Sequence, residues 1–146
     1  MEYAYIYLII ILLLFFAVVT AFFFYQYHLL NRIKVENRMM RPGYVWLQLI
    51  PLFGLYWQFR VVTAISKSIY GELESRLDKG SLIFNESDSL IQKKPAYTEG
   101  IIYCILVCAS IIPIPAVKIL ASVIGIGAWI RYIIVLRRFE RRLKNY

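Results

Sequence analysis

Long apolar stretches dominate the chain. The first, residues 6–24, holds no charged side chain, and as a helix it can cross the roughly 30 Å hydrocarbon core of a bilayer. Tyrosines crowd both of its ends, as interfacial aromatic anchors do: Tyr3, Tyr5, Tyr7, Tyr25 and Tyr27. We expect a transmembrane helix over residues 3–27. No basic region precedes it and no small-residue cleavage motif follows it, so we expect a retained anchor.

The second apolar segment, residues 44–60, is irregular. Pro51 and Gly54 interrupt its middle, which predicts a kink or a reversal of the chain. Beyond it, apolar residues recur every four positions among charged ones: Ile65, Ile69, Leu73 and Leu77. We therefore expect an amphipathic helix that continues to residue 79, followed by a polar loop over residues 80–96.

The third region, residues 97–136, predicts a helical hairpin. Its turn lies at Pro113 and Pro115, because neither proline donates a helical hydrogen bond. The last helix then continues as a basic amphipathic tail over residues 137–146. The predicted fold is all-α: a single polytopic membrane domain with one anchor helix and two helix–proline–helix units.

Composition supports the membrane assignment. Of the 146 residues, 60% are hydrophobic, and the mean hydropathy is +0.61, whereas soluble domains are nearer 45–50% apolar. The formal net charge of +8 is typical of Lys and Arg gathered on the cytoplasmic side of a membrane. We therefore expect the lipid bilayer as a partner and no nucleic acid.

The distribution of charge sets the topology. Lysine and arginine occur in three segments: the loop after the first helix, residues 66–98, and the C-terminal tail. Each of these segments therefore favours the cytoplasm. Four plain crossings cannot place all three there. Three crossings can, if residues 42–59 enter the membrane and return as a re-entrant segment. The sequence is consistent with three or with four spans. The re-entrant arrangement and the four-span arrangement with the N-terminus inside both place residues 66–98 and the tail in the cytoplasm.

Polar residues beside the proline break are the candidate pore or partner contacts. These are Gln48, Pro51, Gly54, Gln58 and Arg60. Buried polar groups in a membrane are expensive, and they often have a function. The structural alternative for the two glutamines is hydrogen bonding between helices.

Opposite charges on the two long helices form a second candidate set. If both helices extend under the membrane, acids on one could pair with arginines on the other: Glu72, Glu74 and Asp78 with Arg137, Arg138, Arg141 and Arg142.

The residues of common active sites are scarce. His28 is the single histidine, and at a membrane boundary we expect it to be solvated. Cys104 and Cys108 share one helix face, which disfavours a disulfide, and without nearby His or carboxylate they make no zinc site. We expect no cofactor, no metal and no enzymatic activity.

The segment that begins at Pro42 resembles a family of small bacterial membrane proteins, of the Bacteroidota type, that carry a domain of unknown function. The likeness lies in Pro42-Gly, Trp46, the Ile-Pro-Leu-Phe run that ends at Phe53, the Ser-x-Ser-Ile run that ends at Ile69, and the Gly-x-Gly-x-Trp run that ends at Trp129. It covers roughly residues 30–140. The resemblance implies a helical fold in a bacterial inner membrane and brings no assigned activity.

Two functions are expected from these features. The first is a non-catalytic membrane subunit or scaffold, acting through helix packing and its charged cytoplasmic extensions, as a homo-oligomer or with a membrane or cytoplasmic protein partner. The alternative is a small homo-oligomeric channel or pore-forming effector, with the broken segment lining the path.

Overall fold

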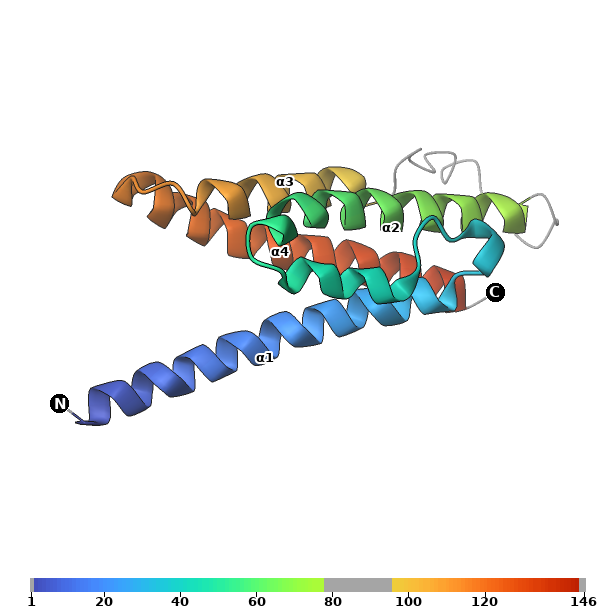
Figure 1. Ribbon diagram of the computed structural model, residues 1–146. Coiled ribbons are helices and arrows are strands. Elements are labelled where there is room, and N and C mark those ends of the chain that lie inside the picture. The colour runs from blue at the N-terminus through green and yellow to red at the C-terminus, as the bar shows by residue number, and fades with distance from the viewer. Residues whose placement is uncertain (1, 78–95, 145–146) are drawn as a thin grey trace.

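The computed structural model describes residues 2–77 and 96–144 (Figure 1). In those ranges every regular element is a helix: α1 (Glu2–Arg32), η1 (Val35–Asn37), η2 (Pro42–Leu49), α2 (Phe53–Leu77), α3 (Tyr97–Ala109) and α4 (Pro115–Lys144). The predicted all-α fold is confirmed. Two helices are long and apolar enough to cross a membrane, over Tyr3–Arg32 and Pro115–Leu143.

Two apolar arms diverge from a packed base. The first half of α1 runs away from the other helices, and the α3–α4 hairpin forms the second arm (Figure 1). The packed base joins the second half of α1 to α2, α3 and the end of α4. Its most buried apolar side chains are Leu29, Leu30, Ile33, Val45, Val61, Ile65, Ile69, Cys104, Tyr132 and Leu136.

Helix α1 is longer than the sequence predicted. It continues five residues past residue 27, to Arg32. Leu29 and Leu30 lie three and four residues after the buried Gln26, and at that spacing a helix keeps all three on the buried face. The exposed His28 therefore lies within the helix, and its ring meets Phe24 edge-on at 4.5 Å.

The first proline unit is a hairpin with unequal sides. The segment expected over residues 44–60 divides at residues 50–52: η2 leads into the turn, and α2 returns beside it (Figure 1). Helix η2 is a 3₁₀ helix of eight residues. Most 3₁₀ helices are shorter, because their hydrogen-bond geometry is poorer than that of an α-helix. The packing of η2 against both α1 and α2 compensates for that weakness.

The second proline unit is a pair of α-helices. Helices α3 and α4 meet at residues 110–114, where the sequence predicted the turn. The basic tail is not a separate element: α4 is continuous to Lys144, and Tyr132 and Leu136 keep its second half in the packed base. The predicted loop over residues 80–96 lies outside the described residues except for Ala96, which is buried.

Candidate functional site

The tip of the first hairpin is built around Gly54. A Cβ atom on this glycine would lie 2.2 Å from the backbone oxygen of Gln48, so no other residue fits without movement of the backbone. The Gly54 amide donates to the oxygen of Ile50 at 2.7 Å and closes the turn. Leu52 takes a left-handed conformation with φ 62°, which is uncommon for a residue with a side chain. The tip is therefore specified by close backbone contact.

Trp57 joins the two sides of this hairpin. Its indole nitrogen donates to the backbone oxygen of Tyr44 at 2.7 Å, and its ring stacks on Phe53 at 5.2 Å. The bond satisfies a backbone oxygen of the 3₁₀ helix. This matters in a membrane, where irregular backbone persists only when protein groups shield it.

Gln48 connects the hairpin to α1. Its side-chain nitrogen donates to the Gln26 side-chain oxygen at 2.9 Å and to the Val45 backbone oxygen at 3.1 Å. Gln26 is buried, with 1% of its surface exposed. Gln26 was not among the predicted contacts, although it is the one side-chain amide within residues 3–27, and a lone amide in an apolar helix of that length is a functional signal.

The other predicted contacts are spread over several surfaces. Gln58 is buried and donates a weak bond to the Cys108 sulfur on α3 at 3.8 Å. Pro51 and Arg60 are exposed. The two glutamines therefore bond to different helices, and the five predicted residues do not converge on one cavity.

A buried carboxylate fastens the loop after α1 to α2. Glu72 is fully buried and accepts from Asn37 Nδ2 at 2.8 Å, from the Lys34 amide at 3.2 Å and from Arg76 Nε at 3.0 Å. Burial by itself raises the pKa of Glu72, but these donors outweigh it and lower the pKa below its ordinary value of 4.5. Glu72 is a structural anion that orders residues 34–37.

The predicted pairing of Glu72 with the arginines of α4 is wrong. Glu72 faces the loop and pairs with Arg76 of its own helix. Glu74 is exposed, and it accepts a hydrogen bond of 3.5 Å from the Tyr70 hydroxyl of its own helix. Asp78 lies outside the described residues. Of the four arginines, Arg137 lies 6.0 Å from the ring centre of Tyr25, while Arg138, Arg141 and Arg142 are exposed.

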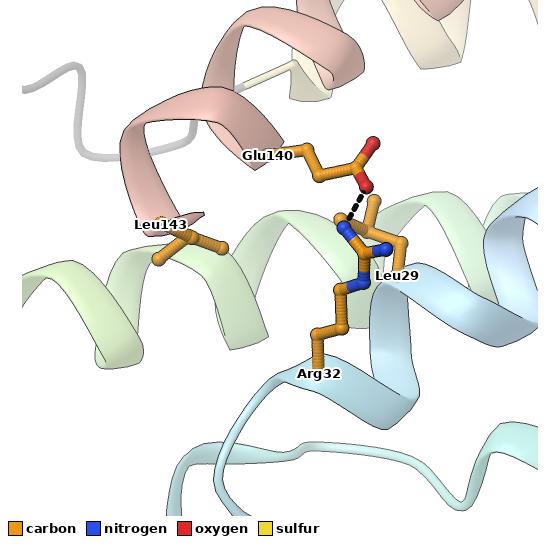
Figure 2. A pocket seen from close by; sticks show the side chains of 4 residues that line it. All are labelled: Leu29, Arg32, Glu140 and Leu143. Atoms are coloured by element: carbon orange, nitrogen blue, oxygen red, sulfur yellow. Dashed lines mark hydrogen bonds and ion pairs between the residues drawn. The ribbon is translucent and has the colours of Figure 1, made fainter. Parts of the chain in front are cut away.

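Different residues join the helix ends. Arg32 of α1 pairs with Glu140 of α4 across a pocket of about 200 Å³ that Leu29 and Leu143 also line (Figure 2). Arg76 of α2 donates to the Leu143 backbone oxygen at 2.9 Å, which satisfies a carbonyl at the end of α4. Glu140 is the one acid after residue 99, a signal that would have pointed to this pair.

Within residues 2–77 and 96–144, no group of three His, Cys, Asp or Glu side chains is placed to hold a metal. Cys104 and Cys108 are free thiols. The chain matches no protein-family model, no curated protein and no solved structure.

Proposed function

We propose that the protein is a non-catalytic membrane scaffold with three crossings and a re-entrant hairpin. The crossings are α1, α4 and α3 together with the turn at residues 110–114, because the 13 residues of α3 alone rise only about 20 Å. The hairpin of η2 and α2 enters from the side of the packed base. Its function then depends on the surfaces that it presents to other proteins. The resemblance to small bacterial membrane proteins agrees with a place in the inner membrane.

The direction of the hairpin supports the re-entrant arrangement. Its tip at residues 50–53 points the same way as the first half of α1 and the α3–α4 turn, whereas the end of α4 lies at the other end of the molecule (Figure 1). Eight residues of 3₁₀ helix rise about 16 Å. That length reaches about halfway through a roughly 30 Å hydrocarbon core. The tip is apolar and exposed at Leu52 and Phe53.

The unpartnered first arm is the observation that carries the scaffold proposal. Every residue from 3 to 18 is exposed and apolar. One anchoring crossing does not require this arm to leave the bundle, because α1 could pack along α3 and α4 for its whole length. The divergence leaves an apolar face between the arms, which suits a helix of another membrane protein or of a second copy.

The packed base supplies the second surface. Cations cluster at the end of the molecule that holds the C-terminal part of α4. Six are exposed, namely Arg32, Lys34, Arg137, Arg138, Arg141 and Arg142, and Arg38 is half-buried. Positive residues near membrane helices favour the cytoplasm. We therefore place residues 66–98 and the tail in the cytoplasm, where they face a cytoplasmic partner.

A channel is the weaker candidate. Its polar lining would have come from Gln48 and Gln58, but both side chains are engaged with neighbouring helices at 2.9 Å and 3.8 Å. The polar groups of the hairpin therefore hold helices together within one chain. A pore would have to form between copies along surfaces that carry other residues.

Membrane-impermeant maleimide labelling of intact cells tests the topology. Val35 is 78% exposed and Tyr3 is 76% exposed, so each accepts a cysteine without loss of packing. The re-entrant arrangement predicts that Tyr3→Cys reacts from outside and that Val35→Cys reacts only after lysis. Labelling of Val35→Cys from outside would end it, and the wild-type chain controls for the native thiols.

Photo-crosslinking and ion flux test the scaffold. A photoreactive residue at Leu12, on the first arm, should give one discrete protein adduct, whereas the same group at the buried Ile65 should give none. Purified protein in liposomes should not conduct ions. Conductance combined with lipid adducts alone at Leu12 would replace the scaffold with a channel.

A further inference from the structure

The second arm carries a groove between its two helices. It lies where the start of α3 meets the middle of α4 and has a volume of about 480 Å³, within the range of about 300–1,000 Å³ that is usual for small-ligand sites. Thr98, Glu99 and Ile102 line it from α3, and Ile124, Gly127 and Arg131 line it from α4.

Gly127 makes the groove hollow. A Cβ atom there would meet nothing within 4 Å, whereas one on Gly125 would lie 3.5 Å from Leu106. The two helices are held in place nearby by Gly100, where a Cβ would come within 2.4 Å of Val62 and 2.9 Å of Tyr132. The groove is thus an open space beside a close contact of α3 with α2 and α4.

The two ends of the groove differ in chemistry. Glu99 and Arg131 lie at the end nearer the packed base, and Ile102 and Ile124 form an apolar wall deeper in the arm. Among the residues that the structure describes, neither Glu99 nor Arg131 has an ion-pair partner. One anion and one cation therefore stand open at the same rim.

In the three-crossing arrangement proposed above, on which this inference rests, the rim lies at the depth of a membrane interface. From Lys118 to Arg131 the helix rises about 20 Å, and the residues between them include no charged side chain. Long cationic side chains at such positions extend toward the headgroups. The polar end of the groove therefore meets headgroups while its apolar wall faces acyl chains.

We propose that this groove binds one aminophospholipid of the phosphatidylethanolamine class. The guanidinium of Arg131 binds the phosphate, the carboxylate of Glu99 binds the primary ammonium, and one acyl chain lies along Ile102 over the hollow at Gly127. A phosphatidylglycerol headgroup offers no cation to Glu99. A choline headgroup carries a cation without N–H donors, so it cannot donate a hydrogen bond to the carboxylate.

Native mass spectrometry of the full chain tests the proposal. Protein released from detergent micelles that contain equal phosphatidylethanolamine, phosphatidylcholine and phosphatidylglycerol should retain one phosphatidylethanolamine. Its preference over phosphatidylcholine should be about threefold to fivefold, the size of one net hydrogen bond at an exposed site. Equal retention of the three lipids would overturn the proposal.

Variants separate the parts of the site. Glu99→Gln should abolish the preference between headgroups, and Glu74→Gln, an exposed acid outside the groove, should not. Arg131→Gln should lower retention of all three lipids, and Arg131→Lys should restore most of it. Gly127→Leu fills the hollow and should prevent binding, whereas Ala116→Leu, at an exposed position of the same helix, should not.

Two outcomes of the Gly127→Leu variant contradict lipid binding. If lipid retention is unchanged, the groove is not the site. If the variant converts a dimer to a monomer without affecting retention, the groove is a contact for a second copy. An unfolding transition that matches that of the wild-type chain shows that the variant has folded, and Gly127→Val, with a smaller side chain, replaces the leucine variant if it has not.

Discussion

The first half of α1 and helix α2 show opposite relations between composition and burial. Residues 3–18 carry no charge, yet all of them are exposed. Helix α2 contains lysine, glutamate and arginine, yet Val61, Ile65 and Ile69 are fully buried within it. In water the first arm would be an apolar patch far larger than soluble monomers expose. Lipid tails are as apolar as leucine side chains, so in a bilayer its exposure has no such cost.

The comparison shows which helix organises the protein. The packed base is built around α2, whose amphipathic pattern must be matched by neighbours on a particular face. The first arm has no such face, because no other described part of the chain packs against residues 3–18. Stability should therefore depend on substitutions in α2 and be nearly indifferent to apolar substitutions in the first arm.

The largest expected effect tests this difference directly. Ile65→Ala should lower the free energy of unfolding by about 2–5 kcal/mol, because it leaves a cavity in the base. Leu12→Ala, at a position that is 65% exposed, should change it by about 0.5 kcal/mol or less. Equilibrium unfolding by SDS titration in mixed micelles measures both. Equal losses would mean that the first arm is packed against protein.

A second substitution tests the hairpin within the base. Gly54→Ala should lower the free energy of unfolding by about 1–3 kcal/mol, because the new Cβ overlaps the Gln48 backbone. Gly43→Ala is the matched control, since a Cβ there meets nothing within 4 Å. The same titration compares the two. A neutral Gly54→Ala would contradict the close approach at the tip.

The buried carboxylate gives the base a dependence on pH that the first arm lacks. Because the pKa of Glu72 is lowered on folding, its contribution is fully present above its unfolded pKa and is lost as pH falls through the folded value. Stability should therefore fall below about pH 4.5. Glu72→Gln should cost about 1–3 kcal/mol at neutral pH and flatten that fall.

The exposed Glu74→Gln should leave both the stability and its acid dependence unchanged. Unfolding followed across pH 3–7 distinguishes the two acids. If Glu72→Gln shows the same pH dependence of stability as the wild-type chain, the acid sensitivity belongs to other carboxylates.

The smallest expected effect lies where the first arm enters the base. A double-mutant cycle of Gln26→Leu and Gln48→Leu should give a coupling of about 0.6 kcal/mol, typical of hydrogen bonds between membrane helices. Zero coupling would mean that the 2.9 Å hydrogen bond does not contribute to the free energy with which the hairpin packs on α1.

Sequence alone determined the all-α fold, the two longest apolar helices and the two breaks at prolines. Apolar blocks and prolines are local signals: a proline removes a hydrogen bond wherever it stands. For this reason the break at Pro51 and the turn at Pro113 lie where they were predicted. The amphipathic repeat of Ile65 and Ile69 also identified the buried face of α2.

Tertiary structure decided which apolar surface meets protein. Side chains that face lipid and side chains that face protein have the same chemistry, so hydropathy could not separate Leu12 from Leu29. Nor could it show that Glu72 would prefer the amides of a loop 35 residues away to the arginines of α4. Such choices depend on the geometry of distant segments, which brings Leu29 into the packed base and leaves Leu12 exposed.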